Sequence, residues 1–162
     1  MNNIWKVLGG VFVVILAIYL LSSSSTESIP SCTSTLDQPR IQGQLIQYDQ
    51  GPADEITATY PTPNKQIGIY ERTRLLDTIQ NNTYWREDVL FVRDINTSVQ
   101  ERTVTSNSNG CFEISTEDVQ DPFLCIEGFR PNTNYCFNMT GNESDIQFEH
   151  LPQSGGWFTN NF

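Results

Sequence analysis

The stretch "FLCIEGFRPNTNYCF", Phe123 to Phe137, consists of two short apolar runs separated by a polar segment that contains a proline. Successive side chains of a β-strand point to opposite faces of the sheet. Leu124 and Ile126 therefore share one face, and Cys125 lies on the other. If the chain turns at the proline, Cys125 comes opposite Cys136. The stretch predicts a β-hairpin closed by a cross-strand disulfide.

The same alternation extends to the segment before this hairpin, "TVTSNSNGCFEIS", from Thr103 to Ser115. Its Asn-Gly pair is typical of a tight hairpin turn. After the turn, Phe112 and Ile114 share the core face, which places Cys111 on the outer face. Beyond the hairpin, Tyr135, Phe137 and Met139 likewise point inward by alternation. We therefore expect all the strand cysteines on the outer face of their sheet.

The cysteines and sequons indicate an oxidising compartment. An even number of cysteines is typical of disulfides in such a space, and the four candidates are Cys32, Cys111, Cys125 and Cys136. They allow three pairings. The hairpin favours Cys125–Cys136, which leaves Cys32 to bond Cys111 and to pin the segment before the sheet. Four N-x-S/T sequons agree with this location and are candidate glycosylation sites: Asn81, Asn96, Asn138 and Asn142.

The N-terminal segment is apolar. No charged or strongly polar side chain occurs from Val7 to Leu21, and Ile4 extends the run past Lys6. At a rise of about 1.5 Å per residue, a helix from Ile4 to Leu21 reaches ~27 Å, close to the ~30 Å hydrocarbon core of a bilayer. We predict a transmembrane signal anchor over residues 1–21. A removed signal peptide and a buried core helix are the alternatives.

Charge predicts the orientation and excludes some partners. Lys6 precedes the apolar run, whereas all 19 acidic residues follow it. By the positive-inside rule the N-terminus is cytoplasmic and the chain after Ser22 is extracytoplasmic. Residues 22–39 are rich in Ser, Thr and Pro and read as a linker. The net charge of −10 repels nucleic acid and anionic lipid headgroups, so we expect no nucleic-acid partner.

Beyond the linker, short runs of strand-forming residues recur between turn residues, and no stretch has a helical period. Many short strands separated by Asn, Gly, Pro and Asp predict an all-β sandwich or barrel. The segment from Gln50 to Asn64 contains several prolines and reads as a long loop. We predict one antiparallel β-sandwich over residues 40–151 and a flexible aromatic tail over residues 152–162.

The order of these pieces resembles the transthyretin-like β-sandwich of carboxypeptidase regulatory-like and collagen-adhesin B-type repeats. The resemblance rests on "IQGQL" (Ile41 to Leu45), "PNKQIGIYE" (Pro63 to Glu71), "TSNSNGCFEI" (Thr105 to Ile114) and "RPNTNYCFNM" (Arg130 to Met139). It implies the sandwich fold and says little about function. Some adhesin repeats form a Lys–Asn amide cross-link, for which Lys65, Asn138 and Glu113 would be the candidates here. The outward position of Asn138 disfavours that reaction, which needs a dry interior.

The sequence predicts no catalytic, cofactor or metal site. His150 is the only histidine, and no nucleophile-elbow motif accompanies it. We interpret it as an ordinary exposed or edge residue. No Cys-x-x-Cys pair suits zinc, and the carboxylate pairs lie in turns. "DINTS" and "GNESD" offer clustered oxygen atoms for calcium, without the spacing of a high-affinity loop.

Aromatic residues in polar surroundings are the candidate interaction residues. The tail "GGWFTNNF" carries Trp157, Phe158 and Phe162 after two glycines. Exposed aromatic side chains often anchor protein interfaces, and an extended tail can add a strand to a partner's sheet. Capping of the core is the alternative interpretation. We expect the tail to be a docking segment.

These observations lead to three functional hypotheses. The first is a non-enzymatic, membrane-anchored extracytoplasmic β-sandwich that acts as a cell-envelope or surface scaffold or interaction module. The second is an accessory single-span subunit of a larger membrane complex or surface filament. The third is a small-ligand-binding, glycan-binding or hydrolytic domain that uses the acidic loops. Size analysis after mild-detergent extraction separates the first two, and a ligand-dependent melting shift tests the third.

Overall fold

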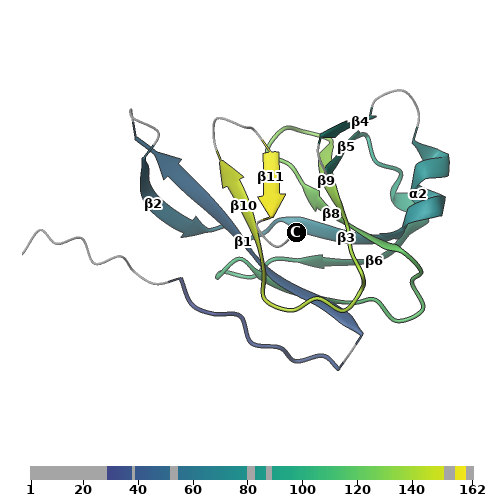
Figure 1. Ribbon diagram of the computed structural model, residues 1–162, viewed down its shortest axis with the longest axis horizontal. Helices are drawn as coiled ribbons and strands as arrows, with labels where there is room; N and C mark the ends of the chain where they lie inside the picture. The colour runs from purple at the N-terminus through teal and green to yellow at the C-terminus, as the bar shows by residue number, and fades with distance from the viewer. Residues whose placement is uncertain are drawn as a thin grey trace, which may run out of the picture.

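The computed structural model describes residues 29–37, 39–51, 55–79, 83–86, 89–151 and 156–159. The predicted membrane segment, the sequon at Asn81 and the tail residue Phe162 lie outside these ranges. Within them, no helix combines the length and the apolar character needed to cross a membrane. The described chain is mostly β-structure, in two sheets that pack as a sandwich (Figure 1).

Among the described residues, sheet A has five strands and sheet B has six. Sheet A contains β1 (Arg40–Gln50), β2 (Ile56–Pro61), β7 (Cys111–Ser115), β10 (Ile146–Leu151) and β11 (Gly156–Thr159). Sheet B has the order β4 (Thr83–Arg86), β5 (Val89–Arg93), β9 (Thr133–Asn138), β8 (Pro122–Glu127), β3 (Gln66–Glu71) and β6 (Gln100–Thr105). A short helix, α2 (Arg72–Thr78), and a 3-10 turn, η1 (Thr97–Val99), complete the described elements.

Strand β1 organises sheet A because it pairs along both of its edges. One edge pairs with β10, and the other pairs first with β7 and then, further along, with β2. The β1–β10 pair is parallel, so the expectation of a purely antiparallel sandwich is wrong for this pair. Parallel neighbours need a long connection between them, and here nearly the whole domain separates the two strands in sequence.

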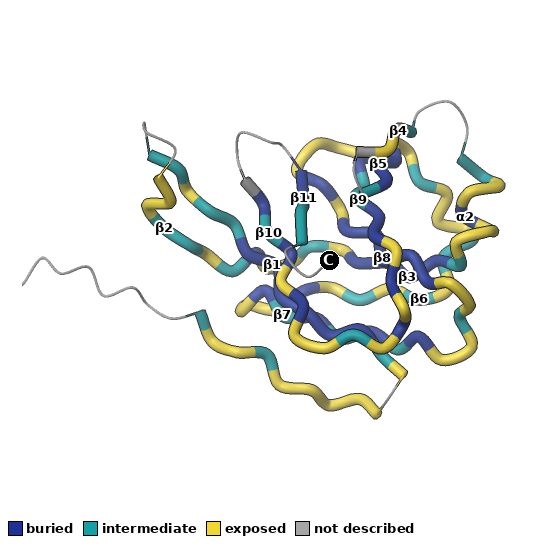
Figure 2. The backbone as a smooth tube through the Cα atoms, in the orientation of Figure 1, coloured by how far each residue is buried: buried dark blue, intermediate teal, exposed yellow. Residues whose placement is uncertain are grey.

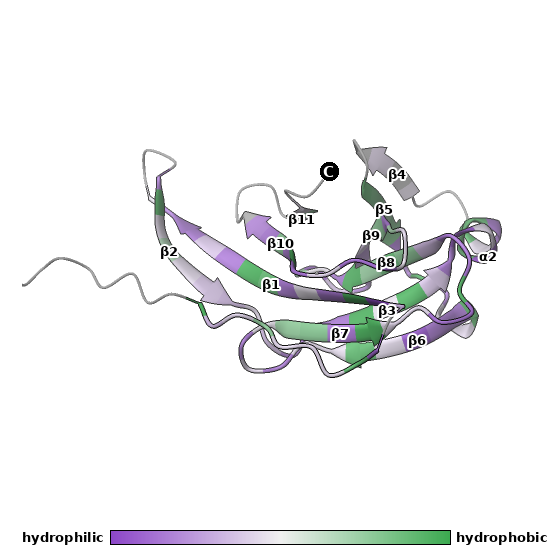
Figure 3. Ribbon diagram, turned by 60° about the horizontal axis from the view of Figure 1, so that its bottom comes forward, coloured by the Kyte–Doolittle hydropathy of each residue, from purple (hydrophilic) through white to green (hydrophobic). Residues whose placement is uncertain are grey.

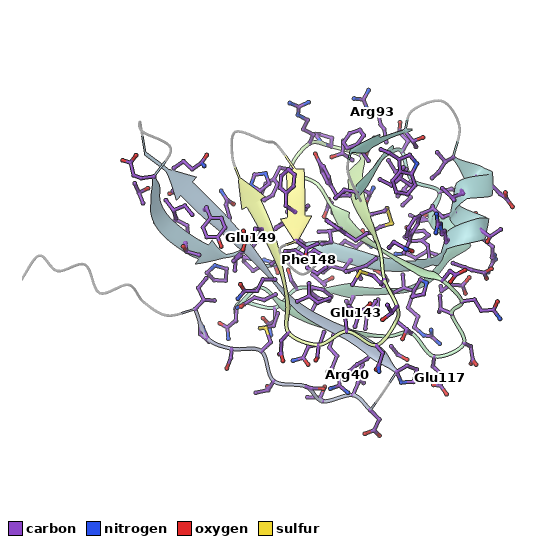
Figure 4. The ribbon with its side chains drawn as sticks, viewed as in Figure 1. Arg40, Arg93, Glu117, Glu143, Phe148 and Glu149 are labelled. Atoms are coloured by element: carbon purple, nitrogen blue, oxygen red, sulfur yellow. A yellow bond between two sulfur atoms is a disulfide. The ribbon has the colours of Figure 1, made fainter. Side chains whose placement is uncertain are left out.

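The core lies between the sheets and is built from alternate strand residues (Figures 2 and 3). Phe148 lies at its centre, with its ring centroid 4.9 Å from that of Phe137 and 5.9 Å from that of Phe112 (Figure 4). The residues predicted to face inward by alternation belong to this core: Phe112, Ile114, Leu124, Ile126, Phe137 and Met139. Tyr135, also predicted to face inward, is partly buried against it.

The structure contains elements that the sequence pattern does not predict. Helix α2 is seven residues long, which is too short to reveal a helical period. Strand β2 occupies part of the predicted loop from Gln50 to Asn64. The prolines of this segment suggested a loop, because proline lacks a backbone donor. Proline is nevertheless tolerated at strand ends and sheet edges, and β2 is an edge strand that ends at Pro61.

The predicted flexible tail is wrong for residues 156–159, because they form β11 against β10. Trp157 pairs with His150 across the two strands and is 0% exposed. Burial of so large an aromatic side chain stabilises the added strand. The sandwich therefore extends beyond its expected end at residue 151, to Thr159.

Candidate functional site

The lead-in, residues 29–37, lies against the outer face of sheet A and is covalently bonded to it. Cys32 and Cys111 form a disulfide with their Cα atoms 5.6 Å apart. Nε2 of Gln42 donates to the carbonyl oxygen of Cys32 at 3.2 Å, and Nε2 of Gln44 donates to that of Pro30 at 3.0 Å. Both glutamines are buried. The chain before β1 is therefore fastened to the sheet, and the disulfide is the predicted pairing of Cys32 with Cys111.

A single carboxylate holds the next part of the lead-in. Glu113, on the outer face of β7, accepts hydrogen bonds from the backbone N–H groups of Thr35 and Leu36 at 2.9 and 3.0 Å, and from the hydroxyls of Ser34 and Thr35. It also pairs with Nε of Arg40 at 3.0 Å. Burial alone raises the pKa of Glu113, but these hydrogen bonds outweigh it and lower the pKa to about 2.

The outer face of sheet B carries the second disulfide. Cys125 and Cys136 lie directly opposite each other on β8 and β9, with their Cα atoms 4.0 Å apart. Both cysteines lie on the outer face, as expected, and α2 packs over this face through Leu75. The buried cluster consists of Tyr70, Leu75, Leu90, Val92, Phe123, Cys125 and Cys136, with Ile79, Ile95 and Val99 packed against it.

The remainder of this outer face is open and hollow. A cleft of about 370 Å³ lies beside the buried cluster, and we call it the sheet B cleft. Gly68 and Cys125 contribute from β3 and β8. The segment from Asp94 to Gln100 forms one side, and Asn132 with the start of β9 forms another. The cleft is lined by Gln66, Gly68, Tyr70, Asp94, Ile95, Thr97, Gln100, Cys125, Glu127, Asn132, Thr133 and Asn134.

Backbone contacts hold the two sides of the cleft together. The N–H of Asp94 donates to the carbonyl oxygen of Asn132 at 2.8 Å. Both residues have a left-handed backbone, with φ of 54° and 58°, a conformation that Asp and Asn adopt more readily than other non-glycine residues. Burial raises the pKa of Tyr70, which borders both the cleft and the buried cluster, to about 12. Its phenol therefore stays neutral.

His150 is buried among aromatic rings, so its interpretation as an exposed residue is wrong. Its ring centroid lies 3.8 Å from that of Phe129 and 5.6 Å from that of Trp157. Both ring nitrogens are buried without a hydrogen-bond partner. Burial and the nearby charge of Lys65 lower the pKa of His150 to about 4. Alternation from Ile146 and Phe148 places His150 on the core face, a signal that the interpretation of it as an exposed residue did not use.

The two described residues of the predicted docking tail, Trp157 and Phe158, are not exposed. Trp157 is buried and donates from Nε1 to the carbonyl oxygen of Glu127 at 3.0 Å, while Phe158 is half-buried within β11. Large exposed apolar side chains lie elsewhere: Ile56 and Tyr60 on β2 and Trp85 on β4. These two strands are at the edges of their sheets.

The described sequons are accessible. Asn96, Asn138 and Asn142 are all exposed. Asn96 accepts a hydrogen bond on its side-chain oxygen from the N–H of Ser98 at 3.0 Å, which caps η1. Nothing in this geometry blocks attachment of a glycan at these three positions.

The acidic loop "GNESD" is occupied by local contacts. The Glu143 carboxylate accepts hydrogen bonds from the backbone N–H groups of Thr140 and Gly141, and so closes its own turn. Within the described ranges, no group of three or more His, Cys, Asp or Glu side chains could hold a metal ion.

Lys65 donates from Nζ to the carbonyl oxygen of Gly128 at 3.0 Å, and Glu113 binds the lead-in. Both candidate residues therefore contact groups other than Asn138.

No family model, curated protein or solved structure matches this chain. The described residues form a two-sheet β-sandwich with two disulfides, which indicates an extracytoplasmic domain. Sequence reasoning missed the sheet B cleft. Alternation does place Gln66 and Gly68 on the face opposite Ile67 and Ile69, but it does not show which half of that face the chain covers.

Proposed function

We propose that this protein is a non-enzymatic interaction module, held at the outer surface of a membrane by the apolar segment from Ile4 to Leu21. The observation that carries the proposal is the fastening of the lead-in to sheet A by the Cys32–Cys111 disulfide and Glu113. Only residues 22–28 then separate the apolar segment from the folded body, and they reach at most about 25 Å. The domain would stay close to the membrane.

The exposed apolar side chains on edge strands support a protein partner. Tyr60 on β2 is 49% exposed and Trp85 on β4 is 50% exposed. Edge strands present unpaired backbone groups that can pair with another chain, and aromatic residues are enriched among interface anchors. We therefore assign the docking surface to β2 and β4 instead of the tail.

The position of His150 supports a non-enzymatic role. A general base must come within hydrogen-bond reach of the proton that it removes. The imidazole of His150 is enclosed by Phe129 and Trp157, and both of its nitrogens are buried. The only histidine of the chain is therefore not placed to act on a substrate.

We further propose that the sandwich is of the transthyretin-like type. Two glycines of the resembling motifs have structural roles that support this. A Cβ on Gly43 would lie 2.8 Å from the carbonyl oxygen of Ile146, and Gly110 has a φ of 72° at the turn before β7. Both positions therefore require glycine. An experimental structure with a different strand order would contradict the assignment.

Extraction and sizing of the native protein test the function. We expect the full chain to remain in membranes after an alkaline carbonate wash, and to elute as a complex larger than the monomer after mild-detergent extraction. Y60S and W85S should shift it toward monomer. L76S, on an exposed leucine of α2, is the matched control and should leave the complex intact. A chain released by carbonate, or a monomer before substitution, contradicts the proposal.

A further inference from the structure

The sheet B cleft is the part of the molecule whose chemistry points most directly to a ligand. Helix α2, Ile95 and Val99 cover only part of the outer face of sheet B, and the cleft lies in the part left open. Its volume of about 370 Å³ lies in the range of small-molecule sites, about 300–1,000 Å³.

The cleft offers hydrogen bonds that the protein does not use itself. Within the described ranges, the side chains of Gln66, Asp94, Gln100 and Asn134 make no hydrogen bond to the protein. The amides provide both donors and acceptors, and a carboxylate provides acceptors only. A complementary ligand carries several groups that both donate and accept, which is the property of a hydroxylated ring.

Charge narrows the class of ligand further. Asp94 and Glu127 both line the cleft, and none of its described lining residues is basic. Phosphate, sulfate and carboxylate ligands are therefore repelled, and a positive charge is favoured. The side chain of Ile95 and the ring of Tyr70 add an apolar surface for the C–H groups of a ring.

The site is also preorganised. The Cys125–Cys136 bond cross-links two of its strands, and the Asp94–Asn132 backbone hydrogen bond joins two of its sides. A Cβ on Gly68 would lie 2.1 Å from Nε2 of Gln100, so the glycine leaves room for that amide. A rigid site loses little conformational entropy when a ligand binds.

We propose that the sheet B cleft binds an amino sugar, a hydroxylated ring with a protonated amine, through Asp94, Glu127 and the surrounding amides. This goes beyond the proposed function, since an anchored interaction module needs no sugar. One side of the site comes from "DINTS", an acidic loop that the sequence offers for calcium, and the site differs from the other such loop, "GNESD".

Three probes of the same ring size test the proposal: glucosamine, glucose and glucuronate. Ligand-observed saturation-transfer NMR suits weak binding, and the full chain should be studied in a detergent whose headgroup contains no sugar, at slightly acidic pH. We expect the strongest binding for glucosamine, weaker binding for glucose and none for glucuronate. Absence of binding by all three probes, equal binding of glucosamine and glucuronate, or glucose binding as strong as glucosamine binding overturns the proposal.

Isosteric variants assign the charge preference to the cleft. D94N keeps a residue that tolerates the left-handed backbone, and E127Q keeps the side-chain shape. Each should reduce the preference for glucosamine over glucose about threefold, the effect of losing one partly exposed charge pair. D145N is the matched control, because Asp145 is exposed, has a φ of 59° and lies outside the cleft. The proposal fails if D145N lowers the preference as much as D94N, or if neither cleft variant changes it.

Discussion

The outer faces of the two sheets are covered in different ways. On sheet A the cover is the lead-in, an extended segment held by polar contacts to Glu113, Gln42 and Gln44 and by a disulfide. On sheet B the cover is α2, which buries Leu75 against an apolar cluster. A disulfide and polar contacts attach the lead-in to sheet A. Helix α2 packs on sheet B through apolar contacts, without a covalent link. The disulfide of sheet B lies beneath its cover and does not attach it.

This difference predicts separate sensitivities. The cover of sheet A should depend on oxidation and on the charge of one carboxylate. The cover of sheet B should depend on apolar volume and respond little to either. The same contrast explains why a polar cleft remains on sheet B: α2 is short and cannot reach the end of the sheet where Gln66 and Glu127 lie.

The largest effect is expected from C32S combined with C111S. This pair closes a loop with a sequence separation of 79, and its loss should lower the free energy of unfolding by about 4 kcal/mol in the chain-entropy model. Denaturant unfolding of the full chain measures the change. Because the bond is the covalent attachment of the lead-in, proteolysis near Pro30 should also become faster. A change below about 1 kcal/mol with unchanged proteolysis argues against a fastened lead-in.

Truncation of the apolar cover of sheet B should have a slightly smaller effect. L75A removes a fully buried side chain and should cost about 3 kcal/mol. Its neighbour Leu76 is 37% exposed, so L76A is a matched control and should cost less than about 1 kcal/mol. L75A should also speed reduction of the Cys125–Cys136 bond by a thiol, measured by alkylation and mass spectrometry. Equal effects of the two substitutions would show that α2 does not cover the cluster.

Acid should destabilise the fold through His150. Its pKa of about 4 in the folded chain is below the value of 6.5 for an unperturbed histidine, so the unfolded state binds the proton first. Stability is therefore present at neutral pH and is lost as the pH falls from about 6.5 toward 4, by about 3 kcal/mol. H150F keeps a ring between Phe129 and Trp157 and should flatten this part of the profile. Thermal melting at several pH values makes the measurement, and an unchanged slope contradicts the burial of the imidazole.

The smallest effect is expected from E113Q. Its carboxylate has a pKa of about 2 in the folded chain, so the stability it contributes is present above pH 4.5 and is lost as the pH falls toward 2. E113Q should cost about 1 to 2 kcal/mol at neutral pH because several charged hydrogen bonds weaken. The exposed Glu117 provides the control, and E117Q should change stability by less than about 0.5 kcal/mol. Indistinguishable variants would mean that Glu113 does not hold the lead-in.

Strand alternation and cysteine spacing predicted much of the fold. Alternation placed Phe112, Leu124 and Phe137 in the core, where the structure has them, because a strand side chain has only two faces to choose from. The hairpin register also put Cys125 opposite Cys136, as observed. These features depend on local geometry, and local sequence determines them.

The features that the sequence did not reveal depend on what packs over a strand. The burial of His150 requires Phe129 from the β8–β9 turn, much earlier in the chain, and Trp157 from the neighbouring strand β11. Strand β11 begins at the second of two glycines, and the burial of Trp157 in the core stabilises it. The sheet B cleft likewise exists because α2 ends where it does. Alternation with Phe148 does place His150 on the core face, but no local pattern shows which other elements pack over a strand or where they end.

The central claim is that the chain folds where thiols oxidise and is clamped by two specific bonds. Peptide mapping of the native protein by mass spectrometry, without reduction and with free thiols blocked at lysis, tests it most directly. The structure predicts two linked peptide pairs, Cys32 with Cys111 and Cys125 with Cys136, and no blocked thiol. Four alkylated cysteines, or Cys32 linked to either hairpin cysteine, would contradict the account.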